Sequence, residues 1–165
     1  MSRELHTIVA LVEDRPGVLN RITSRWRQRG FNIESLAVGH SETPGLSRMT
    51  FVIDAANTDV EQVVKQVDKL VDIVHIEDIT HRPTVSRELI MIKVKSTAAS
   101  RSAVLQIADI FRANIIDVTA ESLIVEATGD EEKLDSLVQL LEEFGITELC
   151  RTGRVAMQRG AERVG

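Results

Sequence analysis

Residue types that often carry chemistry are scarce in this sequence. One of its 165 residues is cysteine, Cys150, which excludes an intrachain disulfide and a thiol-rich metal site. Tyrosine is absent, and four Phe and one Trp are the whole aromatic content, so the core has to be built from Val, Ile and Leu. The four histidines lack the spacing of metal ligands, and we expect no metal site: His6, His40, His75 and His81.

Motifs for phosphate binding and nucleophilic catalysis are missing as well. Neither GxGxxG nor a P-loop occurs, so nothing is expected to cradle a nucleotide phosphate. Cys150 has no histidine near it in the sequence and is interpreted as a small hydrophobic filler. We therefore expect no catalytic centre in this chain.

The charge and the length of apolar runs exclude further classes. The net charge is -5 without a long basic run, which argues against nucleic acid because a polyanion requires a clustered positive surface. No apolar run is long enough to span a membrane, and the first residues lack the apolar stretch of a signal peptide. We expect a cytoplasmic protein that binds neither nucleic acid nor membrane.

The residues that are present predict a folded chain. Apolar residues make up 43% and charged residues 27%, which suits a buried core. Residues 5–12 are apolar apart from His6 and Thr7 and predict a strand with one well-covered face. A helix over 17–29 carries Trp26 on its apolar face and ends at Gly30. The first half continues with strands at 32–40, around 49–53 and at 71–79, and with a helix that a Thr58–Glu61 capping box opens.

The second half repeats this pattern. Strands are expected at 88–95, 115–119, 123–128 and within 146–157, and helices at 101–112 and 130–143. The sequence thus predicts an α+β protein of two ferredoxin-like βαββαβ units. The expected domains are 1–80, a linker at 81–87, a C-terminal domain at 88–158 and a flexible tail at 159–165.

The segment between the first strand and the first helix has the chemistry of a ligand site. Helix N-termini present N–H groups without intrahelical partners and attract anions. Gly17 lets a ligand approach the backbone, and Asp14 can accept hydrogen bonds from an ammonium group. Asn32, before the next strand, offers a donor and an acceptor. Together these groups suit the carboxylate and ammonium of a free amino acid.

A simpler interpretation of these residues stays open. Pro16-Gly17 is also a common turn before a helix, and Asn32 could merely cap backbone groups. The equivalent loop of the second half, residues 96–101, has neither glycine nor an acidic residue. If the two halves share a fold, the first is the better ligand site.

Longer runs carry a resemblance to a known family. Residues 12–19 resemble the signature of ACT domains, which bind amino acids at domain interfaces. Residues 29–36, 47–50, 86–89 and 111–119 resemble the regulatory small subunit of acetohydroxyacid synthase (acetolactate synthase), in order and over nearly the whole chain. One departure is Trp26, where Phe is more usual; it is interpreted as a core substitution.

The resemblance implies a function in branched-chain amino-acid biosynthesis. It implies an ACT domain for effector binding and dimerisation in the first unit, and an ACT-like regulatory domain in the second. Such a subunit activates a catalytic large subunit, which holds thiamine diphosphate, a divalent metal and FAD, and confers feedback inhibition, usually by valine. The effector site of the family lies between two ACT domains of a dimer. Carried over, it falls on Asp14, Gly17, Val18, Leu19, Asn32 and Ile33.

Two other functional classes compete with this one. A stand-alone metabolite sensor or transcriptional co-regulator would require a DNA-binding segment or partner, and no helix-turn-helix pattern occurs. A ferredoxin-like enzyme or RNA binder would want exposed aromatic residues on the sheet, of which there are too few.

Overall fold

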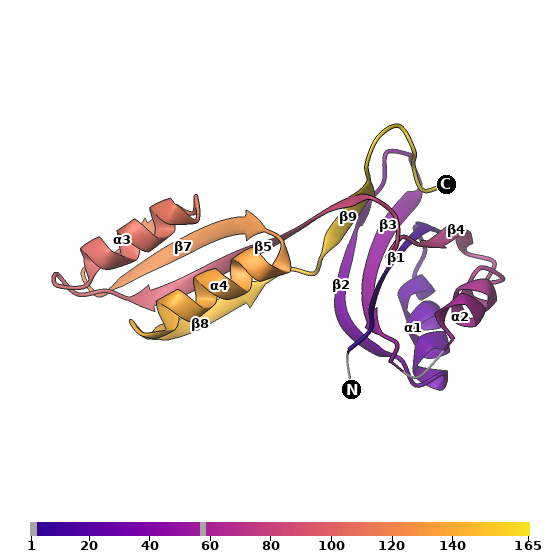
Figure 1. Ribbon diagram of the computed structural model, residues 1–165. Coiled ribbons are helices and arrows are strands. Elements are labelled where there is room, and N and C mark those ends of the chain that lie inside the picture. The colour runs from indigo at the N-terminus through magenta and orange to yellow at the C-terminus, as the bar shows by residue number, and fades with distance from the viewer. Residues whose placement is uncertain (1–2, 57–58) are drawn as a thin grey trace. The chain divides into compact units, whose positions relative to one another are not determined.

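The computed structural model describes residues 3–56 and 59–165 as two βαββαβ units, followed by one further strand (Figure 1). The first unit contains β1 (Leu5–Glu13), α1 (Val18–Gln28), β2 (Asn32–His40), β3 (Leu46–Asp54), α2 (Val60–Val67) and β4 (Ile73–Asp78). The second contains β5 (Thr84–Lys95), α3 (Arg101–Ile110), β6 (Asn114–Val118), β7 (Ser122–Gly129), α4 (Glu131–Glu142) and β8 (Ile146–Arg151), and β9 (Val155–Gln158) follows. The predicted fold class is confirmed.

The two sheets have the same topology. The strand order is β2-β3-β1-β4 in the first and β6-β7-β5-β8 in the second, so equivalent strands occupy equivalent places. Register shifts also recur at equivalent positions, in β2 between Ile33 and Ser35 and in β6 between Ile115 and Asp117. The repeat inferred from the sequence therefore extends to the irregularities of its strands.

The core of the first unit lies between its sheet and its two helices. Val18, Ile22 and Trp26 recur every fourth residue along α1 and are buried, as expected for one face of a helix. The Trp26 ring packs edge-on against Phe51 with ring centroids 4.1 Å apart, so Trp26 is a core residue, as predicted. Its Nε1–H is buried without a hydrogen-bond partner among the described residues. In the second unit, Ile90, Ile92, Leu134, Leu137 and Leu141 form the equivalent core. The interpretation of Cys150 as a buried filler is wrong, because this residue is exposed on the edge strand β8.

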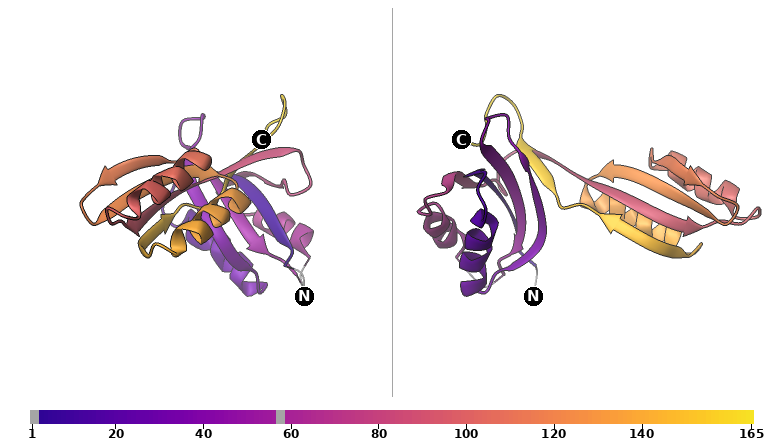
Figure 2. Two further views of the ribbon diagram at one scale, coloured as in Figure 1. Left: turned by 60° about the vertical axis from the view of Figure 1, so that its left-hand side comes forward. Right: turned by 180° about the vertical axis from the view of Figure 1, so that it is seen from behind.

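Strand β1 departs from the prediction because both of its faces are covered. Seven consecutive residues, 6–12, are buried, with Ile8, Ala10 and Val12 facing the helices. On the other face, Val9 and Ile79 pack against Ala156 and Val164 from the end of the chain. Figure 2 shows this C-terminal segment on the side of the first sheet opposite its helices. Near-continuous apolar strands are typical of burial on both faces.

The predicted domain boundaries need correction at this point. The first unit consists of residues 1–85 and 153–165, and the second of residues 86–152. Strand β9 pairs with β5, and the Arg159 amide donates to the carbonyl of Pro83 at 2.8 Å. The second unit is therefore an insertion between two paired segments of the first. The predicted linker at 81–87 instead leads into β5, and part of the predicted tail at 159–165 is packed, with Val164 buried.

One helix start also differs from its prediction. Thr58, the first residue of the expected capping box, lies outside the described residues. The N-cap of α2 is Asp59, whose side chain accepts a hydrogen bond from the Gln62 amide at 3.3 Å. Aspartate is a strong N-cap, so the helix begins one residue later than the capping box implied.

The covering of the first sheet generates a prediction about fragments. A fragment of residues 1–85 exposes Val9 and Ile79, whose burial each contributes about 1.5–3 kcal/mol. A fusion of residues 1–85 through a short Gly-Ser linker to residues 153–165 should therefore unfold at higher urea concentration than the fragment alone. An Ala156→Asp version of the fusion is the control and should lose the gain. Equal midpoints for fragment and fusion would contradict this role of the segment.

Candidate functional site

A four-residue loop joins β1 to α1 and is fixed by its backbone. The Asp14 amide donates to the Gly45 carbonyl in the β2–β3 turn at 2.9 Å, and the Glu13 amide donates to the Asp72 carbonyl at 2.9 Å. Arg15 folds back on Glu13, with 2.8 Å between Nε and Oε2. The loop is thus anchored to both neighbouring connections before α1 begins.

Gly17 gives this loop an open helix N-terminus. It is the N-cap of α1 and adopts a φ of 84°, the left-handed conformation that favours glycine. No side chain caps α1 or α3, whereas Asp59 and Asp130 cap α2 and α4. The Val18 amide donates to the Arg15 carbonyl at 3.5 Å, and the N–H groups of Leu19 and Asn20 remain available to an anion.

Arg21 and Asp72 support the loop and were not predicted. Nε of Arg21 donates to the Asp72 carboxylate at 2.8 Å, and this carboxylate is buried. A Cβ added at Gly17 would lie 3.0 Å from Nη1 of Arg21. The guanidinium thus stands beside the open helix end, with its charge paired to the buried Asp72 carboxylate. The sequence carried no signal for this pair, since the partners are 51 residues apart.

The other predicted residues of the loop differ in accessibility. The Asp14 carboxylate is half-exposed and lies 3.5 Å from Nδ1 of His40, at the end of β2. Val18 is buried in the core, and its amide donates to the Arg15 carbonyl at 3.5 Å. Leu19 is partly buried against the same core. Of the predicted residues in this loop, Asp14 and Gly17 are exposed.

Asn32 and Ile33 begin β2. Asn32 is exposed, and its Nδ2 donates to Oε1 of Glu34 at 2.6 Å. The register with β3 shifts between Ile33 and Ser35, which makes Glu34 an extra residue in the strand, a β-bulge. The carbonyl oxygen of Asn32 is an acceptor that suits an ammonium group.

A single chain does not bring these two groups together. Glu13 pairs with Leu46, next to the His40 end of β2, whereas Asn32 pairs with Asp54 at the far end of β3. Eight residue steps along β1 separate the two ends, which is about 27 Å. A site made of all six predicted residues requires a second copy of the chain.

The equivalent loop of the second unit, residues 96–101, is held by hydrogen bonds from its own side chains. The Thr97 amide donates to Oγ of Ser100 at 2.9 Å, and the Ser100 amide donates to Oγ1 of Thr97 at 3.2 Å. Nε of Arg101 donates to Oγ of Ser96 at 3.1 Å. Like α1, α3 has no side-chain cap, but its loop is held by these hydroxyl groups and has no glycine at the N-cap, which supports the preference for the first unit.

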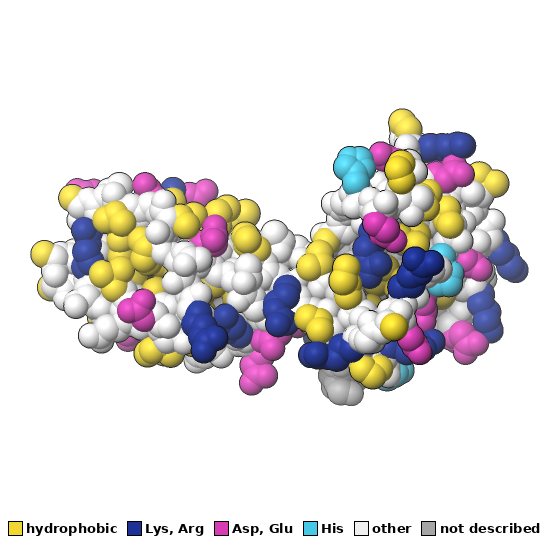
Figure 3. Space-filling view, turned by 90° about the horizontal axis from the view of Figure 1, so that it is seen from above, with side chains coloured by type: hydrophobic (Ala, Val, Ile, Leu, Met, Phe, Trp, Pro, Cys, Tyr) yellow, Lys and Arg dark blue, Asp and Glu magenta, His cyan; other side chains and the backbone are white. Residues whose placement is uncertain are grey.

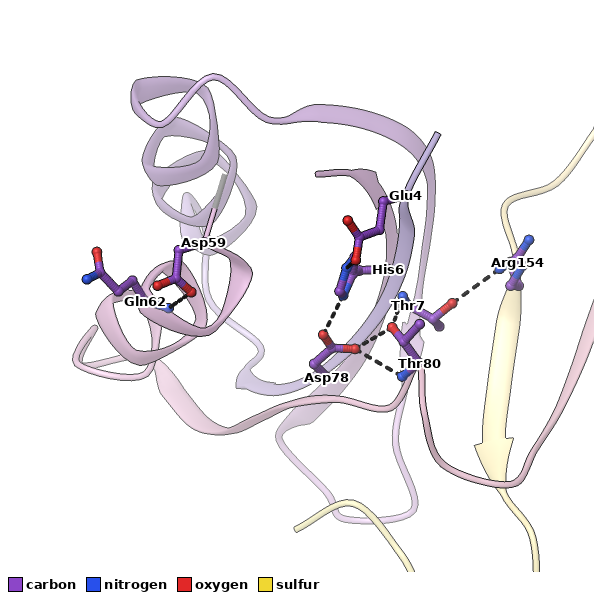
Figure 4. A network of polar contacts seen from close by, with 8 residues as sticks. All are labelled: Glu4, His6, Thr7, Asp59, Gln62, Asp78, Thr80 and Arg154. Atoms are coloured by element: carbon purple, nitrogen blue, oxygen red, sulfur yellow. Dashed lines mark hydrogen bonds and ion pairs between the residues drawn. The ribbon is translucent and has the colours of Figure 1, made fainter. Parts of the chain in front are cut away.

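A second polar cluster lies in a cleft of about 600 Å³ between α2 and the β1–β4 edge. Nδ1 of His6 is 2.7 Å from Oδ2 of Asp78, and the Thr80 amide donates to Oδ1 at 2.9 Å, as does the Thr80 hydroxyl (Figure 4). Burial by itself raises the pKa of Asp78, but the hydrogen bonds from Thr80 and His6 outweigh it and lower that pKa.

Two absences among the described residues bear on other kinds of site. No group of three or more His, Cys, Asp or Glu side chains there is arranged to hold a metal ion. None of the helices there is long and apolar enough to cross a bilayer.

Comparison with known proteins gives a consistent family. The family model described as the small subunit of acetolactate synthase matches residues 87–160, and that of the AHAS small subunit-like ACT domain matches residues 8–75. The chain is 49% identical to the acetolactate synthase small subunit of Mycobacterium bovis, over 100% of this chain and 98% of that protein. It is 48% identical to a probable acetolactate synthase small subunit of Methanothermobacter thermautotrophicus, over 98% and 96% of the two chains.

A solved structure agrees with these sequence matches. The crystal structure of the acetolactate synthase small subunit from Thermotoga maritima superposes with a TM-score of 0.87 at 37% identity. The match covers 96% of this chain and 99% of that one, so it extends over both units.

The Asp78 cluster generates a prediction about pH. Because the pKa of Asp78 is lowered in the folded state, its contribution to stability is present above its unfolded pKa, about 3.9, and is lost as the pH falls through the folded value. Asp78→Asn should cost about 1 kcal/mol of unfolding free energy at pH 7, a modest value because 26% of the side chain is exposed to solvent. The difference from the parent should shrink below about pH 4.

Urea unfolding from pH 3 to pH 8 measures this difference. Asp109→Asn, an exposed aspartate on α3, is the control and should leave the unfolding free energy nearly unchanged at every pH. A difference for Asp78→Asn that does not depend on pH would contradict the proposed contribution of its charge.

Proposed function

Because the chain belongs to the family of acetolactate synthase small subunits, we propose that it activates a catalytic large subunit and confers feedback inhibition by a branched-chain amino acid, with valine as the first candidate. Membership of the family implies a regulatory role. The choice of effector and the activation are our inference from that role and from the chemistry of the first unit.

The observation that carries the effector site is the open N-terminus of α1 at Gly17. Its free N–H groups and the Arg21 guanidinium beside them suit a carboxylate. The half-exposed Asp14 carboxylate lies at the same end and suits an ammonium group. An α-amino acid carries both groups a short distance apart, and this pairing supports the proposal.

A two-fold dimer would complete the site. Strand β2 is at the edge of the first sheet, where unpaired backbone groups favour pairing with another strand. Antiparallel pairing of β2 with its copy would bring Asn32 and Ile33 of one chain beside His40 and Asp14 of the other. A homodimer with two equivalent sites follows from this geometry.

The partner that we propose for catalysis is the large subunit. Thiamine diphosphate, a divalent metal and FAD are assigned to that subunit, and none of them to this chain. On the face seen in Figure 3, basic and acidic side chains are interspersed and hydrophobic side chains gather over part of the second unit. The second unit has exposed apolar side chains, such as Ile110 and Val118, and these are suited to a protein partner. The cytoplasm is the proposed location.

A stand-alone sensor built from two ACT units is the alternative. The two functions differ in their partners, so a pull-down with the purified chain from an extract of its own cells separates them. Recovery of a thiamine-dependent large subunit supports the regulatory subunit, and its absence, with the synthase present in the extract, favours the sensor.

The effector site generates a prediction about Gly17. Gly17→Asp would place a carboxylate against that of the effector, and loss of two hydrogen bonds to a charged group raises the half-inhibitory valine concentration about a hundredfold. Asn32→Ala removes one polar anchor and should have a smaller effect. Maximal activation of the large subunit should survive both changes, because we assign it to a different surface.

Reconstituted synthase activity across a valine titration measures this effect. Gly160→Asp is a matched control, since Gly160 has a φ of 80° and a similar backbone penalty. If Gly17→Asp stays as valine-sensitive as the parent, the site is misplaced. If Gly17→Asp also loses activation of the large subunit, the fold is damaged, and the titration is repeated with Gly17→Ala.

A second prediction tests whether two chains build one site. Gly17→Asp and Asn32→Asp should each strongly weaken valine binding in their own homodimers. A mixed dimer of the two variants has one site with both changes and one with neither, so co-expression should restore valine binding detectable by calorimetry. A site built within one chain would give no restoration.

A further inference from the structure

The C-terminal segment, residues 153–165, makes its first contact with the strand that carries Asn32. It covers the face of the first sheet opposite the helices, where Ala156 and Val164 pack on Val9 and Ile79. Before reaching that cluster, it crosses the backbone of β2 at Ser35 and Leu36. These residues follow Asn32 and Ile33 along the same strand.

Gly153 fits this crossing because it has no side chain. A Cβ at this position would overlap the carbonyl group of Leu36 and lie 2.9 Å from its amide nitrogen. The neighbouring atoms belong to the backbone and cannot rotate away. The φ of Gly153 lies outside the left-handed region, so the close approach, and not the backbone conformation, requires glycine here.

Arg154 connects the segment to two strands through hydrogen bonds. Its amide donates to Oγ of Ser35 on β2 at 3.2 Å, and its Nη1 donates to Oγ1 of Thr7 on β1 at 3.2 Å. Figure 4 shows the guanidinium of Arg154 pointing toward Thr7. The amide of Thr7 donates in turn to Oγ1 of Thr80 at 2.9 Å, so the anchor extends to the end of β4.

The bulge at Glu34 lies between this anchor and the effector residues. Glu34 accepts the hydrogen bond from Asn32, and Ser35 on its other side accepts the bond from Arg154. A bulge re-aims the side chains around it, and its geometry depends on what holds the strand on either side. Beyond the bulge, β2 is held by its pairing with β3 and by the contacts of residues 153–154.

We propose that Gly153 and Arg154 are positioning residues for the effector site, which hold the β2 bulge in the geometry that presents Asn32 to the effector. This inference rests on the proposed function. It makes the first two residues of the C-terminal segment part of the regulatory site, although neither contacts the effector. Thr152 alone separates this anchor from β8, the last strand of the second unit, so the chain of that unit leads directly into it.

The test uses the full-length chain with its large subunit. Gly153→Ala should raise the dissociation constant for valine about tenfold, equivalent to about 1.4 kcal/mol, and raise the half-inhibitory concentration in parallel. Maximal activation should stay within about twofold of the parent. Calorimetry on the small subunit gives the first value, and reconstituted activity gives the other two.

Gly129→Ala is the matched control. Gly129 lies on β7 of the second unit and, like Gly153, has a φ outside the left-handed region, but a Cβ there would meet only the flexible side chain of Lys133. Its valine affinity should therefore match that of the parent. A general weakening of the fold would lower activation together with inhibition, whereas a positioning role separates the two.

A milder variant decides the matter if Gly153→Ala also loses activation. Ser35→Ala removes only the hydroxyl that accepts from Arg154, and it should weaken valine binding about fivefold, within the range of one hydrogen bond. The inference is overturned if Gly153→Ala keeps activation and parental affinity, or if it misfolds and Ser35→Ala binds valine like the parent.

The outcomes also separate this inference from the proposed function. If the parent chain binds no branched-chain amino acid, the proposed function fails and this inference falls with it. If the parent binds valine and Gly17→Asp does not, while Gly153→Ala binds normally, the effector site stands and the positioning role alone is wrong.

Discussion

The burial of β1 on both faces is the constraint on which the rest of the structure depends. Seven consecutive residues of this strand are buried, and two helices can cover only one face of a four-stranded sheet. The other face is covered by the end of the chain, through Ala156 and Val164. Because that segment has to return to the first sheet, residues 86–152 become an inserted unit, and the returning chain has to cross β2 at Gly153.

The two units share one architecture and differ in the loop that we propose to bind the effector. Their strand orders and β-bulges correspond, and Asn114-Ile115 begins β6 as Asn32-Ile33 begins β2. The difference lies in the loops before α1 and α3. Neither helix has a side-chain cap, but the N-cap of α1 is Gly17 with a φ of 84°, whereas the loop before α3 carries reciprocal hydrogen bonds between Thr97 and Ser100. A duplicated fold can thus carry the proposed ligand site in one copy alone through a few loop residues.

The predicted site residues are separated along the sheet, and this separation is the functional reason for the proposed dimer. Within one chain, the open helix end and Asn32 lie at opposite ends of the sheet, so neither half of the proposed site is sufficient. Pairing across the free edge of β2 would join them. The proposed effector would then bind between chains and stabilise their contact, which is how binding at an interface can be linked to assembly.

The sequence by itself determined the elements and the repeat, because helix and strand periods, Gly30 and Gly145 are local signals that neighbouring residues carry. It also identified the loop at Gly17, since a strand, a glycine and a helix are consecutive there. It could not reveal that Arg21 pairs with Asp72, or that residues 153–165 belong with residues 1–85, because the partners lie far apart in the chain. The tertiary structure alone decided that Asp14 and Asn32 are at opposite ends of the sheet, since strand register depends on pairing between distant segments.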